Sequence, residues 1–570
     1  MRRLNLIGLA LIMPFLTLPL PATTATRARG RAVAYAAPTT ASAAARAAAE
    51  RIKAEKIKED LYVIASDEMA GRDTPSAGLD AAAKFIAERL RKLKLKPAGD
   101  DGSYFQNIEL RRTEIDRQQT TAHLGERAFR VAEDFLPASS GGGAAEGQLV
   151  FAGHGWVVGS KGLNAYEGLD VRDKIVVVAG DGRTPPPGLT LKDISDAPAG
   201  SWETPVSYAQ KHGAKGLVFV PRDFPRRWRY GAFAASRPAF YPARLADEED
   251  EDAAGGGPAA EAPALPAIIP SASMLDTLFE GERADGARVL RAAVFGEAVP
   301  GFALAPSKRL RVALSLKVDR ARTQNVVAVV EGRDPSLKRE YVALGAHYDH
   351  VGTGRPVAGD SIYNGADDDG SGTVSLLAMA EAFARGPRPR RSILFVWHAG
   401  EEKGLWGSQY FTEFPTVPLG QIVAQLNIDM IGRSRRAGDT NPRNRMLTGP
   451  DEIYVIGSRM MSTELASMSE SVNRSYLNLK FNYHYDDPHD PERFFYRSDH
   501  YNYARKGIPI IFYFDGVHED YHQPSDHPDK IDYRKMEKVT RTVFVLAAEL
   551  ANADKRPAVD KQLRAALSGR

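Results

Sequence analysis

The sequence of 570 residues contains no cysteine. Disulfide bonds, thiolate metal sites and a cysteine nucleophile are therefore excluded. A strong excess of charge is also lacking, because 75 Lys and Arg stand against 72 Asp and Glu, which leaves a net charge of +3. This near balance gives no indication of a nucleic-acid partner. Hydrophobic residues make up 43% of the chain and charged residues 26%, which are ordinary globular values and exclude a fibrous or disordered protein.

Long apolar runs are absent except at the N-terminus. There, the positive start MRR precedes an apolar stretch over residues 4–20, and small residues follow. This layout is typical of a secretory signal peptide, with cleavage expected after position 22 and at the latest after position 36. A membrane anchor is the alternative, but three prolines within residues 14–21 favour removal. We therefore expect an exported protein, secreted or periplasmic, with no stable membrane insertion after signal removal.

The middle of the chain differs in its pattern from the helical segments before it. Short β-rich runs occur at residues 149–152, 174–179 and 216–220. Residues 246–266 form an acidic insert rich in Gly, Pro and Ala, which predicts a disordered surface loop because it has little to bury. An acidic docking tail is the alternative interpretation of this insert.

From about residue 318 onward, apolar strands alternate with helices. Strands are expected at residues 325–330, 341–347, 392–398, 422–428 and 508–514, and helices at residues 373–384 and 536–551. This alternation predicts an α/β fold with a largely parallel sheet covered on both faces.

Acidic and histidine-bearing segments stand at or just past the ends of these strands. They are GAHYDH (345–350), NGADDDGSG (364–372), HAGEEKG (398–404), NIDM (427–430) and YHQP (521–524). The carboxyl ends of strands are where open α/β sheets bind ligands. Each segment alone has an ordinary structural explanation, but so many carboxylates at one sheet edge require cations. A metal pair bridged by a carboxylate supplies them.

These segments resemble the co-catalytic dizinc exopeptidases of the bacterial leucyl aminopeptidase type, a metallopeptidase family of the MH clan. The likeness rests on GAHYD (345–349), GADDD (365–369), EEKGLWGS (401–408) and YHQPSD (521–526), in the family's order. It implies a three-layer α/β/α zinc-exopeptidase fold with a mixed, largely parallel sheet. Residues 166–180 and 207–220 resemble a protease-associated (PA) domain, which implies a β-rich domain inserted into the catalytic fold.

The resemblance implies two zinc ions per chain and assigns the residues that hold them. His347 and Asp429 would bind one ion, Glu402 and His522 the other, and Asp368 would bridge them. The remaining assignments are catalytic: Glu401 as general base for a metal-bridged water, Asp349 as the residue that orients His347, and Tyr521 as a hydrogen-bond donor to the oxyanion. Residues 498–500 (SDH) are read as site wall. No role is assigned to His350, His398, His484, His489 or His527.

The resemblance also suggests how the chain is divided. The expected segments are a signal peptide (1–22), a low-complexity tail (23–45), the N-terminal part of the peptidase domain (46–125), an inserted PA domain (126–310), the main catalytic part (311–555) and a C-terminal tail (556–570).

Hydrolysis of N-terminal residues from peptide substrates is the expected activity. A carboxypeptidase or dipeptidase of the same fold, a glutaminyl cyclase-like enzyme with one zinc, and a metal-free binding protein remain as alternatives.

Residues 518–522 (HEDYH) match the single-zinc H-E-x-x-H signature, which requires a helix, whereas the flanking glycine and prolines predict a loop. No Gly-x-Ser-x-Gly nucleophile motif follows a strand, which argues against a serine hydrolase. The sequence does not indicate an oligomeric state.

Overall fold

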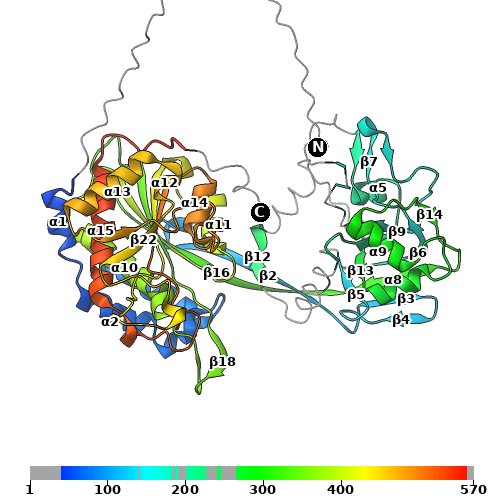
Figure 1. The fold of residues 1–570 in the computed structure, drawn as a ribbon, viewed down its shortest axis with the longest axis horizontal. Coiled ribbons are helices and arrows are strands. Elements are labelled where there is room, and N and C mark those ends of the chain that lie inside the picture. The colour runs from blue at the N-terminus through cyan, green and yellow to red at the C-terminus, as the bar shows by residue number, and fades with distance from the viewer. Residues whose placement is uncertain are drawn as a thin grey trace, which may run out of the picture.

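Two large β-sheets organise the computed structural model (Figure 1). The structure describes residues 40–138, 142–180, 201–224, 240–245 and 265–561, together with residues 182, 185, 186, 188, 189 and 228. The expected signal peptide and residues 246–264 of the acidic insert lie outside the described residues. Among the helices that are described, none has the length and apolar character needed to cross a membrane.

The larger sheet carries the strands expected from the sequence. Its order is β12 (Tyr241–Pro242), β2 (Phe105–Ile115), β16 (Leu316–Val330), β20 (Ser392–His398), β17 (Tyr341–His347), β21 (Ile422–Ile428), β24 (Ile510–Phe514), β22 (Glu452–Ile456) and β23 (Lys480–Asn482), with β1 (Lys96–Pro97) beside β16. The central strands β20, β17, β21 and β24 are mutually parallel. Both flanks join this centre through antiparallel pairs, β16 with β20 and β22 with β24. The sheet is therefore mixed, as expected, and its parallel strands are the central ones.

Helices cover both faces of this sheet, which confirms the α/β fold (Figure 1). One layer contains α1 (Ala43–Ala49), α2 (Ala54–Ile64), α3 (Ala77–Lys92), α10 (Gly372–Arg385), α13 (Thr463–Ser475) and α15 (Tyr533–Asn552). The other contains α11 (Trp406–Glu413), α12 (Ser458–Met461) and α14 (His500–Arg505). Alternate residues of one strand enter the two cores, since Val326 and Ala328 pack in the first and Val327 and Val329 in the second.

A second lobe interrupts the lobe of the larger sheet between β2 and β16, the long strands that connect the two (Figure 1). Its nine-stranded sheet contains β4 (Arg127–Phe129), β3 (Thr121–Leu124), β15 (Arg309–Leu314), β6 (Gly143–Phe151), β9 (Ile175–Ala179), β11 (Gly216–Val220), β13 (Ala267–Pro270), β5 (Phe135–Pro137) and β14 (Phe302–Ala303). Helices α8 (Ala272–Phe279) and α9 (Gly286–Phe295) pack in its core. The chain leaves the main sheet after Ile115 and returns at Leu316, where these two residues pair. These crossings lie outside the limits 126–310 expected from the sequence.

Smaller elements complete the described chain. They are α5 (Pro205–Lys211), the sheet of β10 (Trp202–Glu203), β7 (Val157–Val158) and β8 (Leu163–Asn164), and the hairpin of β18 (Thr353–Val357) and β19 (Asp360–Ile362).

Candidate metal centre

The parallel strands bring the predicted site residues to one edge of the main sheet. His347 is the last residue of β17, and Asp429 follows β21 directly. Glu401 and Glu402 lie in the turn after β20, and His522 lies in the loop after β24. Because these strands run in the same direction, their carboxyl ends meet, and the side chains converge there. Asp368 joins them from η4 (Ala366–Ser371), the turn before α10.

One group of side chains surrounds the His347 ring. Its Nε2 atom lies 3.3 Å from Asp368 Oδ1 and 3.5 Å from Asp429 Oδ1. All three residues are buried, and each offers one atom to a common point. Imidazole nitrogen and carboxylate oxygen are ligand types that zinc accepts, and three protein ligands leave a coordination position open.

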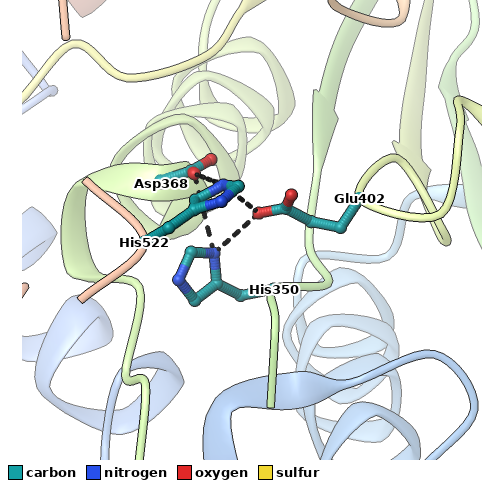
Figure 2. A group of neighbouring side chains, drawn as sticks. All are labelled: His350, Asp368, Glu402 and His522. Atoms are coloured by element: carbon teal, nitrogen blue, oxygen red, sulfur yellow. Dashed lines mark ion pairs between the residues drawn. The ribbon is translucent and has the colours of Figure 1, made fainter. Parts of the chain in front are cut away.

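A second group lies around Glu402, and it contains four residues (Figure 2). His522 Nε2 lies 3.1 Å from Glu402 Oε1 and 3.0 Å from Asp368 Oδ2. His350 Nδ1 approaches the same two oxygens, at 2.9 Å from Glu402 Oε1 and 3.7 Å from Asp368 Oδ2. Sequence reasoning left His350 without a role. The signal was present in the spacing H-Y-D-H, in which a second histidine follows the strand end by three residues.

Asp368 belongs to both groups. Its Oδ1 atom faces His347, whereas its Oδ2 atom faces His522 and His350. A carboxylate that directs one oxygen to each of two ligand groups has the geometry needed to bridge two cations.

The ligand atoms fit a metal better than they fit one another. His347 Nε2, His350 Nδ1, Glu402 Oε1 and His522 Nε2 are all buried, and none makes a hydrogen bond of good geometry to the described part of the chain. Buried polar atoms without partners are rare in native proteins. Their convergence on two points, each with nitrogen and oxygen donors, matches the donor set of a zinc site.

Electrostatics at the second group also favours a cation. Burial would lower the pKa of His522, but Asp368 and Glu402 outweigh it and raise that pKa to about 10. Burial would raise the pKa of Asp368, but the histidines His347 and His522 hold it well below its usual range. The carboxylates thus stabilise positive charge at this position, and a divalent cation satisfies the same field.

Two residues beside the groups have positions suited to supporting roles. Asp349 is fully buried, and its carboxylate lies 3.7 Å from His347 Nδ1, the ring nitrogen that points away from the other ligand atoms. It also accepts hydrogen bonds from the backbone N–H groups of Glu401 and Glu402. Asp349 therefore ties the β17 end to the turn that carries both glutamates.

Glu401 and Tyr521 both face the centre. Glu401 Oε2 lies 3.9 Å from His347 Nε2. Burial raises the pKa of Glu401 well above its usual range, and the neighbouring Glu402 and Asp429 act in the same direction. Burial also raises the pKa of Tyr521, so its hydroxyl keeps its proton, and its ring stacks on His522 with 3.9 Å between centroids.

Residues 498–500 make buried polar contacts beside the centre. Ser498 accepts a hydrogen bond from Asn427 of β21 at 2.9 Å. Asp499 lies 3.3 Å from His398 Nδ1, and the other ring nitrogen of His398 lies 3.0 Å from the Tyr503 hydroxyl. His398, which also had no assigned role, is therefore part of a buried polar network.

The H-E-x-x-H match at residues 518–522 does not form a metal site. These residues lie in a turn rather than a helix, so the two histidines do not share a helical face. His518 is buried and lies 3.2 Å from Asp367, whereas Glu519 is exposed. Loss of His518 would leave the buried Asp367 carboxylate without this partner.

The part of the chain that carries these residues also matches a known protein family. Residues 325–547 match the model of Peptidase family M28. This M28 segment contains every residue of the two groups described above. It begins in β16 and ends in α15, so the second lobe precedes it.

Individual relatives point in the same direction. The chain is 28% identical over 228 residues to a probable leucine aminopeptidase of Arthroderma benhamiae. This alignment covers 38% of this chain and 56% of the relative. The chain is also 29% identical over 199 residues to leucine aminopeptidase 2 of Trichophyton equinum. This second alignment covers 34% of this chain and 34% of the relative. The chain thus spans between a third and about half of the length of these curated relatives. Among solved structures, a zinc aminopeptidase from Bacillus subtilis aligns with 90% of this chain and 98% of its own, at 17% identity and a TM-score of 0.40.

Proposed function

We propose that this protein is a zinc-dependent exopeptidase, an aminopeptidase that releases N-terminal residues from peptides. The observation that carries the proposal is Asp368, whose two carboxylate oxygens face two separate ligand groups. The M28 match and the aminopeptidase relatives support the reaction class. Export and a PA domain in the second lobe remain parts of the proposal, supported by the N-terminal sequence pattern and by the resemblance of residues 166–180 and 207–220.

Two zinc ions would be held by ligand groups of different size, one with four residues and one with three. His347 and Asp429 would hold one ion, Glu402 and His522 would hold the other with His350 beside them, and Asp368 would bridge the two. When bound, such an ion pair acidifies a water molecule and polarises the scissile carbonyl. Asp349 would keep His347 in position, because its backbone carbonyl lies 3.2 Å from His347 Nδ1 and its carboxylate lies 3.7 Å from the same nitrogen.

Proton transfer falls to Glu401. Its carboxylate lies 3.9 Å from His347 Nε2, a position from which it can accept a proton from the attacking water and give it to the leaving amine. The Tyr521 hydroxyl, which stays protonated, can donate a hydrogen bond to the developing oxyanion.

Two glutamine variants test this assignment. In Glu401→Gln, we expect metal content to be retained and kcat on a leucyl-anilide to fall at least a hundredfold, because the base is lost. The matched control is Glu519→Gln, which replaces the exposed glutamate of the H-E-x-x-H match and should turn over at nearly the wild-type rate. Loss of activity in Glu519→Gln with normal turnover in Glu401→Gln would contradict the proposal.

A substrate panel separates the alternatives. An aminopeptidase cleaves aminoacyl-anilides and is blocked by N-acetylation, whereas a carboxypeptidase accepts N-acetylated peptides. Release of pyroglutamate from N-terminal glutamine would indicate the cyclase.

A further inference from the structure

A pocket beside the candidate metal centre combines three kinds of side chain. Asp368, Glu401 and Asp429 form its acidic end, and aromatic residues such as Phe512 and Phe514 form its apolar wall. Arg497 is the one cationic residue among those that line this pocket. It lies directly before Ser498, at the end of the short helix η7 (Phe494–Tyr496).

The guanidinium of Arg497 has no acidic partner within the described residues. Its nearest characterised contact is the Phe494 ring, whose centroid lies 4.8 Å from the guanidinium carbon. No described carboxylate lies within 4.0 Å of it, although many exposed arginines of this chain, such as Arg311 and Arg320, have one. Its charge acts on the pocket interior, because it opposes the burial and carboxylates that raise the pKa of Tyr521.

Arg433, a buried arginine of the same lobe, behaves differently. Arg433 Nη2 lies 2.8 Å from Asp520 Oδ2, and its Nη1 lies 3.6 Å from Asp526 Oδ1. Arg433 is therefore neutralised within the fold, whereas Arg497 is exposed and lines the pocket without a carboxylate partner among the described residues.

We propose that Arg497 binds a carboxylate of the substrate. This inference rests on the proposed function and narrows its substrate class. A planar guanidinium binds carboxylates with two parallel hydrogen bonds, so a free one in a substrate pocket selects for them. The carboxylate comes from an acidic side chain on the N-terminal residue or from the C-terminus of a dipeptide, and both bring the same chemistry to the same group.

Two pairs of substrates distinguish these sources in the metal-loaded, full-length enzyme. Comparing glutamyl-anilide with glutaminyl-anilide tests recognition of a side-chain carboxylate. Comparing Leu-Gly with Leu-Gly-amide tests recognition of a C-terminal carboxylate. We expect kcat/KM for the carboxylate-bearing member of one pair to exceed that of its neutral partner at least tenfold. In Arg497→Gln this ratio should fall to about one through a rise in KM, and Arg497→Lys should restore it in part.

The matched control is Arg493→Gln. Arg493 lies four residues earlier, stacks on Tyr496 at 4.9 Å and is not among the residues that line the pocket, so its replacement should leave both ratios unchanged. Ratios near one in the wild-type enzyme, or an equal loss on all four substrates in Arg497→Gln, would overturn the inference while leaving the proposed function intact. Absence of turnover on all four substrates, in protein shown to contain metal, would overturn both.

Discussion

His350 shows how much a single residue adds to the centre. Its three neighbours in the second group were all predicted from sequence, but a histidine three residues after a ligand has no distinctive signature of its own. Only the turn after β17 makes its Nδ1 atom reach Glu402 at 2.9 Å. A group of four potential ligands differs from the three around His347 and predicts unequal metal affinities.

Replacing His350 should therefore weaken one zinc site selectively. In His350→Gln, we expect the affinity for one of two zinc ions to fall tenfold to a hundredfold, because a ligand or a close supporting partner is lost. Titration calorimetry on metal-free protein measures both sites. The exposed His489 offers the matched control, and His489→Gln should bind both ions as the wild type does. Equal affinities in His350→Gln and the wild type would remove His350 from the centre.

His500 gives the protein a pH-dependent stability. Burial lowers the pKa of this histidine to about 3, whereas its ordinary value is 6.5. Its ring stacks on Phe512 with 4.5 Å between centroids. As the pH falls below 6.5, the unfolded state binds a proton that the folded state refuses, so stability is lost between pH 6.5 and 3.

The variant His500→Phe should lack this acid sensitivity. Between pH 6.5 and 5, we expect the free energy of unfolding of the wild type to fall by about 2 kcal/mol more than that of the variant. Urea denaturation at both pH values measures the difference. Parallel pH dependence of the two proteins would show that His500 is protonated normally in the folded state.

At the scale of elements, Arg72 connects the N-terminal helices to the loops of the centre. It is fully buried, and its guanidinium donates to the backbone carbonyls of Ile64, Tyr348, Asn364 and Gly365 at 2.6–2.9 Å. Two of these carbonyls belong to the loop before Asp368, and one lies next to His347. Arg72 thus fixes the spacing between the two segments that bring ligands to both groups.

Removing this guanidinium should cost much of the stability of the fold. In Arg72→Met, we expect a loss of about 3–5 kcal/mol, because buried carbonyls and the nearby carboxylates lose their cationic partner. Chemical denaturation followed by tryptophan fluorescence measures it. Arg91→Met, at an exposed arginine of α3, is the control and should change stability by less than about 0.5 kcal/mol. A similar small change in Arg72→Met would contradict this role.

At this scale, the sequence predicts where buried strands begin and end, but it does not predict contacts between distant segments. β17, β20 and β21 begin and end where their apolar runs predicted, because a buried strand needs an uninterrupted apolar segment. The partners of Arg72 could not be predicted, since Tyr348 is 276 residues away and no local pattern encodes that contact. A mixed sheet was expected, but no local pattern indicates that β16 and β22 are the strands that pair antiparallel with the parallel centre.

At the scale of the whole molecule, the second lobe is attached in a way that preserves the centre. The chain leaves and re-enters the main sheet at the paired residues Ile115 and Leu316, so an insertion of about 200 residues does not disturb the order of the strands. One short strand, β12, returns from the insertion to pair with β2, and Tyr241 packs on Trp406 of α11 with 5.7 Å between ring centroids. The residues of both ligand groups all lie in the lobe of the larger sheet, at the edge formed by its parallel strands.

Metal content of the purified protein tests the proposed two-metal centre most directly. We expect elemental analysis to find close to two zinc ions per chain in the wild type and in Glu401→Gln. In Asp368→Ala, both ions should be lost or bound far more weakly, because this carboxylate faces both groups. One zinc per chain in the wild type, or two retained in Asp368→Ala, would contradict a bridged pair of metals at this site.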